Sequence, residues 1–257
     1  MSRYWIGKDN YFFTTDGMVI VHSKFLSKAL TNQDANSIVK KSKQPNPPFY
    51  ILDMKKVVKK ALEKEQSIEN LSCEVKRVAN NFASIYIETM DGLLIRVEEN
   101  QVTAYPNLMN RIKILSASTL DGTMLIVTDQ DELHFFSKGL PVEKPKFQHD
   151  CEIILASIGP DAVAIVTRDN VLHVMGKNKY GSCGGGNKSS FTRFCPFEKK
   201  IINVKCGYFH IIVLFEDGIL MATGKNNYKQ CLVCWKTDRI ETFTAPSLPL
   251  RNTSMGR

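Results

Sequence analysis

The feature that most constrains this chain is a unit that occurs twice in its second half, with apolar runs, turn residues and glycines in the same order. In the later copy, an apolar run over residues 211–215 leads to Glu216-Asp217-Gly218, and a second run then reaches Gly224 and a polar loop. Two apolar runs joined by an Asp-Gly turn are typical of a β-hairpin. The earlier copy lies about 48 residues upstream, so this part of the chain is a repeat.

The two copies agree at matching positions of the loop that follows each hairpin. The equivalent residues are Gly176-Lys177-Asn178 with Gly224-Lys225-Asn226, Tyr180 with Tyr228, and Cys183 with Cys231. Agreement at this many positions under one offset indicates a shared structural unit rather than a chance similarity.

Weaker copies of the unit fill the rest of the chain. Turn residues recur at 16–17, 91–92, about 130, 169–170 and 217–218, which gives about five units of about 40 to 50 residues. Short strands and frequent turns at this spacing predict an all-β fold, a β-propeller of about five blades, with residues 1–257 as a single domain.

The first unit lacks its first half, because residues 3–23 contain only an apolar run, an Asp-Gly turn and a second run. Rings of blades are closed when strands from both chain ends share one blade, which removes exposed sheet edges. We therefore expect a closed or nearly closed ring, with residues 240–250 as the donor of the closing strand. An open propeller that needs a partner or a second copy to cover its edges is the alternative.

A lysine-rich stretch over residues 38–70 interrupts the repeats, and we interpret it as an insertion that contains a basic amphipathic helix. On a helical wheel, Val57, Val58 and Ala61 share an apolar face with Met54 and Leu62. The helix either packs this face on the domain with its lysines in water, or docks an acidic partner, a membrane surface or nucleic acid. The candidate partner-binding residues are Lys40, Lys41, Lys43, Lys55, Lys56, Lys59, Lys60 and Lys64.

Composition limits the setting of the protein. The seven cysteines are an odd number without the spacing of a disulfide framework, and we expect reduced thiols. Neither a secretory leader nor a membrane-spanning apolar stretch is recognisable, so we expect an intracellular protein of the cytoplasm or nucleus. The net charge of +8 favours acidic proteins, nucleic acid or anionic lipid without choosing among them.

Residues that could carry chemistry are sparse, and each has a structural explanation. His210 occupies a repeat position with no identifiable catalytic partner. Cys231 and Cys234 have the spacing of a metal-binding pair, but only one such pair exists, and buried apolar thiols are favoured over a zinc or redox site. The glycines at 184–186 lack the residues of a phosphate-binding loop. We therefore expect no catalytic, cofactor-binding or metal-binding residues, and no enzyme.

The later repeats resemble the regulator-of-chromosome-condensation (RCC1-like) family. Gly207-Tyr208-Phe209-His210 matches the Gly-x-x-His of that repeat, Asp217-Gly218 matches its turn, and Gly224-Lys225-Asn226 with Gln230 matches its closing loop. The resemblance covers residues 151–232 well and residues 1–140 weakly. Propellers of this family usually have seven blades, whereas this chain offers about five.

The resemblance implies a module that binds a protein partner, as relatives bind small GTPases, chromatin and ubiquitin-pathway substrates. Guanine-nucleotide exchange on a small GTPase is the best-known activity of the family, but the inserted wedge that performs it has no recognisable counterpart here. The alternative function is chromatin or nucleic-acid binding through the basic insertion between Lys40 and Lys64, for which steep salt dependence would be diagnostic.

Overall fold

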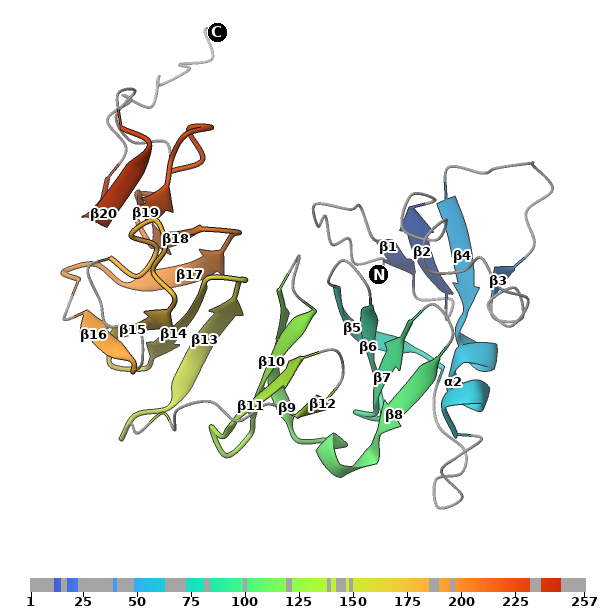
Figure 1. Cartoon of the computed structure of the whole chain (residues 1–257). Coiled ribbons are helices and arrows are strands. Elements are labelled where there is room, and N and C mark those ends of the chain that lie inside the picture. Colours follow the sequence, from blue (N-terminus) through green and yellow to red (C-terminus); the bar gives the residue numbers. More distant parts are fainter. Residues whose placement is uncertain are drawn as a thin grey trace, which may run out of the picture.

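The computed structural model of the chain describes residues 12–14, 18–22, 39–40, 49–62, 73–80, 84–98, 101–118, 122–137, 140–141, 147, 150–184, 190–194, 197–231 and 237–245. These residues form five four-stranded antiparallel sheets (Figure 1). The all-β fold is therefore as the repeats predict, and the described residues include the basic helix expected in the lysine-rich stretch.

The sheets follow one another along the chain. The first contains β1 (Phe12–Thr14), β2 (Met18–His22), β3 (Val39–Lys40) and β4 (Phe49–Asp53). The second contains β5 (Val75–Asn80), β6 (Ile85–Thr89), β7 (Leu94–Val97) and β8 (Val102–Tyr105), followed by the 3-10 helix η2 (Pro106–Leu108). The third contains β9 (Ile112–Ala117), β10 (Thr123–Thr128), β11 (Leu133–Ser137) and β12 (Leu140–Pro141). The fourth contains β13 (Ile153–Ile158), β14 (Ala162–Thr167), β15 (Leu172–Gly176) and β16 (Thr192–Phe194). The fifth contains β17 (Ile201–Cys206), β18 (His210–Phe215), β19 (Leu220–Lys225) and β20 (Arg239–Thr244).

The predicted turns lie between strands. In the second to fifth sheets they join the second strand to the third, and Gly92, Asp131, Asn170 and Gly218 adopt positive φ there. Such a backbone favours glycine, asparagine and aspartate, which explains the recurring turn residues. The predicted turn at 16–17 lies outside the described residues; in the first sheet β1 pairs with β2, and the strand order is β1-β2-β4-β3.

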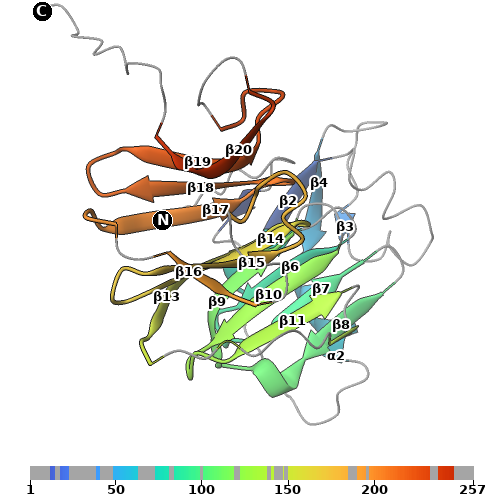
Figure 2. The same ribbon diagram turned by 60° about the vertical axis from the view of Figure 1, so that its left-hand side comes forward.

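Consecutive sheets pack through their inner strands and follow an arc (Figures 1 and 2). Contacts join β1 to β5, β5 to β9, β9 to β13 and β13 to β17. Ring closure is not confirmed, because the described strands of the fifth sheet neither share a sheet with the first nor pack against it. Residues 240–244 of the expected closing segment belong to β20 and pair with β19; residues 246–250 lie outside the described part.

The stretch 38–70 contributes more than a helix. Strands β3 and β4 both fall within it, and β4 pairs with β2 over its whole length. The helix α2 (Met54–Leu62) follows directly and contacts β4, β7 and β8. Val57, Val58 and Ala61 are buried against the second sheet, which confirms that the apolar face of the helix packs on the domain.

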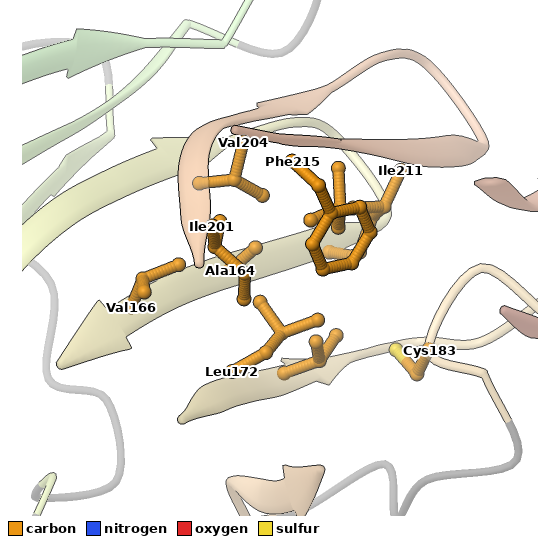
Figure 3. Close-up of a cluster of buried hydrophobic side chains, with 11 residues drawn as sticks. Ala164, Val166, Leu172, Cys183, Ile201, Val204, Ile211 and Phe215 are labelled. Carbon is orange, nitrogen blue, oxygen red and sulfur yellow. The ribbon is translucent and has the colours of Figure 1, made fainter. Parts of the chain in front are cut away.

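The core consists of apolar layers between neighbouring sheets. Between the fourth and fifth sheets, Ala164 and Val166 of β14 meet Ile211 and Phe215 of β18 (Figure 3). Every residue of β14 is buried, because this strand has a packed sheet on both faces. Burying an aliphatic or aromatic side chain stabilises the fold by about 1.5 to 3 kcal/mol, so these layers hold the arc together. None of the described helices is long and apolar enough to cross a membrane.

Candidate functional site

The predicted lysine site lies partly on α2. Lys55, Lys56 and Lys59 are exposed, Lys60 is half-buried, and none of these four is in an ion pair among the described residues. Lys40 ends β3. The remaining candidates, Lys41, Lys43 and Lys64, fall outside the described residues. The helix therefore presents a short basic row to solvent, and its partner-binding role stays a prediction.

A second basic surface is built by the repeated loops of the fourth and fifth sheets, beginning at a close backbone crossing. A Cβ on Gly224 would lie 2.2 Å from the carbonyl oxygen of Phe209, and a Cβ on Gly176 would lie 2.0 Å from that of Asp161. The next residue of each loop donates its N–H to the same carbonyl, at 2.7 Å for Lys225 and 2.8 Å for Lys177. Glycine is required because the two chain segments touch at this point.

The asparagine of each loop closes it from within. Asn178 Oδ1 accepts a hydrogen bond from the backbone N–H of Cys183 at 2.9 Å, and Asn226 Oδ1 accepts one from that of Cys231 at 3.1 Å. The two cysteine side chains are buried beneath their loops. The repeated Gly-Lys-Asn and Cys positions are thus scaffold residues that fix the loops.

Between these loops, two lysines lie over two aromatic rings. The rings of Tyr180 and Phe209 make an edge contact with centroids 4.7 Å apart. Lys179 Nζ lies 5.6 and 5.7 Å from the two centroids, and Lys225 Nζ lies 4.9 and 5.5 Å from them. Tyr208 extends the aromatic group, with its centroid 4.1 Å from that of Phe209. We call these five residues the loop site.

The loop site is accessible and positively charged. Lys179 is exposed, Lys225 is half-buried and Tyr208 is 45% exposed. Among the described residues, neither ammonium group is in an ion pair. An ammonium over an aromatic face is held by the ring while its N–H groups still point outward. The arrangement suits an anionic group, which would interact with both lysines.

A buried carboxylate positions one side of the loop site. Asp161 is 3% exposed, and its Oδ2 accepts hydrogen bonds from Ser182 Oγ and, at 3.2 Å, from the backbone N–H of Lys179. Because a buried carboxylate gains from such donors, it fixes the backbone from which Lys179 reaches the rings. This aspartate has no equivalent in the next sheet, where Phe209 takes the same repeat position.

The side chain of His210 packs against the backbone of Gly207. A Cβ on Gly207 would lie 2.1 Å from His210 Cε1, so the imidazole lies directly on the glycine backbone. Gly207 also donates its backbone N–H to the His210 carbonyl at 2.8 Å. The Gly-x-x-His pattern is explained by this packing.

The thiols of Cys183 and Cys231 are buried, that of Cys206 is half-buried, and all three are poorly ionised. Burial raises the pKa of Cys183 and of Cys231 to about 11, and that of Cys206 to about 12. The thiolate is the form that reacts and binds metals, so these environments disfavour both roles. The described residues contain no group of three or more metal-ligating side chains; Cys195 and Cys234 are not among those residues.

Sequence reasoning recorded the repeated lysine and tyrosine positions but missed the loop site. Lys179 and Lys225 belong to different repeats, and only the packing of the fourth and fifth sheets brings them over the same rings. The signal in the sequence that could have indicated this site was the recurrence of a tyrosine close to lysines in both loops, at Tyr180 and at Tyr228. In the structure Tyr228 is 83% exposed.

Comparison with known proteins agrees with the repeat and the fold. Residues 201–230 match the regulator of chromosome condensation (RCC1) repeat. The X-linked retinitis pigmentosa GTPase regulator of Homo sapiens is 38% identical over 101 residues, which is 38% of this chain and 10% of that protein. Its Caenorhabditis elegans homolog is 33% identical over 91 residues, which is 34% of this chain and 7% of that protein. The chain thus spans a tenth or less of these two relatives.

Solved structures share the architecture at low sequence identity. Prp20p of Saccharomyces cerevisiae, described with its binding properties to Gsp1p and histones, superposes with a TM-score of 0.56 at 15% identity, over 69% of this chain and 52% of that one. Yeast RCC1 (Prp20) bound to Kap60 gives 0.57 at 13% identity, over 69% and 50%. These likenesses show that the chain has the fold of an RCC1-like propeller, of which it spans about half.

Proposed function

We propose that the chain is a non-enzymatic protein-interaction module that binds an acidic surface of its partner at the loop site. The observation that carries this proposal is the placement of two ammonium groups, without acidic partners among the described residues, over one pair of aromatic rings. An intracellular setting, in the cytoplasm or nucleus, is part of the proposal.

The physical chemistry of interfaces supports this choice. Aromatic residues are enriched at the centres of interfaces, where they supply rigid contact area. A carboxylate of the partner would accept hydrogen bonds from Lys179 and Lys225 at once, which is stronger than contact with one exposed lysine. Tyr208 would exclude water from one side of these contacts.

We further propose that the partner is a small GTPase. This rests on the relatives, one of which is a GTPase regulator and another of which is described as binding Gsp1p. Guanine-nucleotide exchange is the finer form of this proposal. Its test is the release of a fluorescent GDP analogue from yeast Gsp1p on addition of the full chain; an unchanged release rate refutes exchange and leaves binding to be judged by itself.

Binding is tested with two probes, GDP-loaded Gsp1p and a glutamate-rich peptide, titrated into the full chain. The double variant Lys179→Ala/Lys225→Ala should bind roughly tenfold or more weakly, because it removes both cations and leaves the rings. Lys177→Ala is the matched control, since this exposed lysine lies in the same loop and outside the ring pair. Equal affinities for the double variant and the control would refute the loop site.

The exposed row on α2 supports a second candidate, chromatin or nucleic-acid binding through the lysines between Lys40 and Lys64. A duplex DNA probe tests it. The logarithm of the binding constant should fall with the logarithm of salt concentration, and Lys55→Ala/Lys56→Ala/Lys59→Ala should reduce that slope by about 0.9 for each phosphate that the triple variant no longer neutralises. A slope that is the same in the wild type and the triple variant refutes this role for the helix.

A further inference from the structure

The loop site carries two positive charges on one pair of rings. The ammonium groups of Lys179 and Lys225 both lie over this ring pair, at most 5.7 Å from either centroid. A ring face attracts an ammonium group through its quadrupole but has no net charge, so it does not neutralise the lysine. Both positive charges are therefore available to one ligand.

Carboxylates that lie against these loops have other partners. Asp161 is buried and accepts hydrogen bonds from a serine hydroxyl and a backbone N–H of the first loop. Glu241, which lies against the backbone of the same loop, pairs with Arg239 at 2.8 Å. Neither carboxylate is in an ion pair with Lys179 or Lys225. Within the described residues, the double positive charge is therefore uncompensated.

A phosphate monoester matches this charge better than a carboxylate does. It carries a charge of about −1.5 to −2 at pH 7 and has three acceptor oxygens, so it can accept hydrogen bonds from both ammonium groups and balance them. A glutamate has a single negative charge and would leave one lysine uncompensated. A phosphate of nucleic acid is a diester with one negative charge and has the same deficit.

The site is open toward solvent, which indicates how the phosphate is presented. Lys179 is exposed, and Tyr208, whose centroid is 4.1 Å from that of Phe209, is 45% exposed. Sites for small molecules usually enclose most of their ligand. An exposed cation beside an exposed ring instead suits a group that projects from a larger surface, with Tyr208 in contact with the chain that bears it.

We propose that the loop site binds a phosphorylated serine or threonine of the protein partner. This inference rests on the proposed function, because it takes the loop site as the surface that binds the partner. The short side chain of serine or threonine is sufficient, because Lys179 is exposed. The inference adds a form of regulation, since the affinity of the site would depend on whether that residue of the partner is phosphorylated.

The test uses the full chain and three peptides with glutamates around one central residue, which is serine, glutamate or phosphoserine. Fluorescence anisotropy measures each affinity. At pH near 7.5, the phosphoserine peptide should bind the wild type roughly tenfold or more tightly than the glutamate peptide, because it balances both lysines. The ratio of these two affinities should fall toward one in Lys179→Ala and in Lys225→Ala. It should be retained in Lys177→Ala, which removes an exposed lysine of the same loop outside the ring pair.

Lowering the pH provides an independent measurement. The second pKa of a phosphate monoester is about 6, so at pH near 5 the phosphate keeps only one of its two charges, whereas a glutamate stays mostly ionised. The ratio of the two affinities should therefore shrink as the pH falls through about 6. His210 follows Phe209 and can titrate in the same range. Its protonation would add positive charge and raise the ratio, so it cannot produce the expected fall.

The outcomes separate this inference from the proposed function. If the glutamate peptide binds and loses affinity in the double variant Lys179→Ala/Lys225→Ala, but phosphoserine binds no more tightly than glutamate, the phosphate is refuted and the acidic-surface proposal stands. If no peptide binds the wild type more tightly than the double variant, both fail. A preference for phosphoserine that survives in either single variant also overturns the inference, because the phosphate then does not engage both lysines. Circular dichroism should show that all variants are folded.

Discussion

Replacing Asn170 should separate the contribution of side-chain hydrogen bonds to stability from the contribution of backbone conformation. It occupies the turn between β14 and β15 at φ 65° and bridges the fourth sheet to the segment that enters the fifth. Its Nδ2 donates to the carbonyls of Phe197 and Lys199 at 3.1 and 2.9 Å, and its Oδ1 accepts the backbone N–H of Ile201 at 2.7 Å. One side chain therefore makes three hydrogen bonds across the gap between two sheets.

The magnitude follows from these bonds and from the backbone. A net hydrogen bond is worth about 1 kcal/mol, so removing the side chain should cost about 3 kcal/mol. Alanine also tolerates the left-handed region less well than asparagine, because it has a Cβ but no polar group to hydrogen-bond locally. This adds about 1 kcal/mol to the loss of stability in Asn170→Ala. Asn170→Gly loses the same bonds without this backbone cost, so it should be about 1 kcal/mol less destabilising than Asn170→Ala.

Urea denaturation followed by far-ultraviolet circular dichroism measures these differences. For a chain of this size, a loss of about 4 kcal/mol in Asn170→Ala corresponds to a fall in melting temperature of roughly 8 to 16 °C. Asn170→Asp keeps the acceptor for Ile201 but turns a carboxylate oxygen toward two carbonyls, and should be as costly as alanine. The reasoning is refuted if alanine costs less than about 1 kcal/mol, or if glycine is no better than alanine.

Three further predictions concern the backbone, the charges and the thiols. Gly224→Ala should destabilise by about 2 to 4 kcal/mol because its Cβ meets the Phe209 carbonyl, whereas Gly218→Ala, with open space around it, should cost about 1 kcal/mol in the same urea assay. Hydrogen bonds from Lys113 and then Arg168 lower the pKa of Glu152. The stabilising effect of this carboxylate is therefore complete above the ordinary glutamate pKa and is lost as the pH falls through the lowered pKa of the folded state. Between those two pKa values, the urea midpoint of Glu152→Gln should fall less with decreasing pH than that of the wild type. Cys206, whose pKa is raised to about 12, should resist iodoacetamide at pH near 8 in the native protein and react in urea, as read by mass spectrometry; fast native labelling would contradict the burial argument.

The turns and the repeat loops were predictable because their residues are chosen by backbone geometry. Asn170 and Gly218 adopt positive φ, and Gly224 lies where a Cβ would meet the carbonyl oxygen of Phe209. These demands act on single residues and leave a visible pattern in the sequence. The hairpins of the second to fifth sheets follow from that pattern. The apolar stripe of α2 was predictable for a different reason, the spacing of its apolar residues at helical intervals.

Other features depend on contacts between distant segments and left no such pattern. Strand β4 lies between a proline-rich stretch and a run of lysines, and only its pairing with β2 identifies it as part of a sheet. The residues of β18, His-Ile-Ile-Val-Leu-Phe, are almost all apolar, so the sequence does not reveal that one face is buried and the other is only half-buried. The loop site likewise exists only because two sheets place Lys179 and Lys225 over the same rings.

The contacts between neighbouring sheets also determine how the molecule opens. Each described sheet packs only against the sheets adjacent to it in the sequence, so no packing between described strands ties the fifth sheet to the first, second or third. The fifth sheet can separate by breaking one apolar layer, whereas the fourth can be released only by breaking two. Backbone amides of β18 and β19 should therefore exchange with deuterium earlier than those of β14.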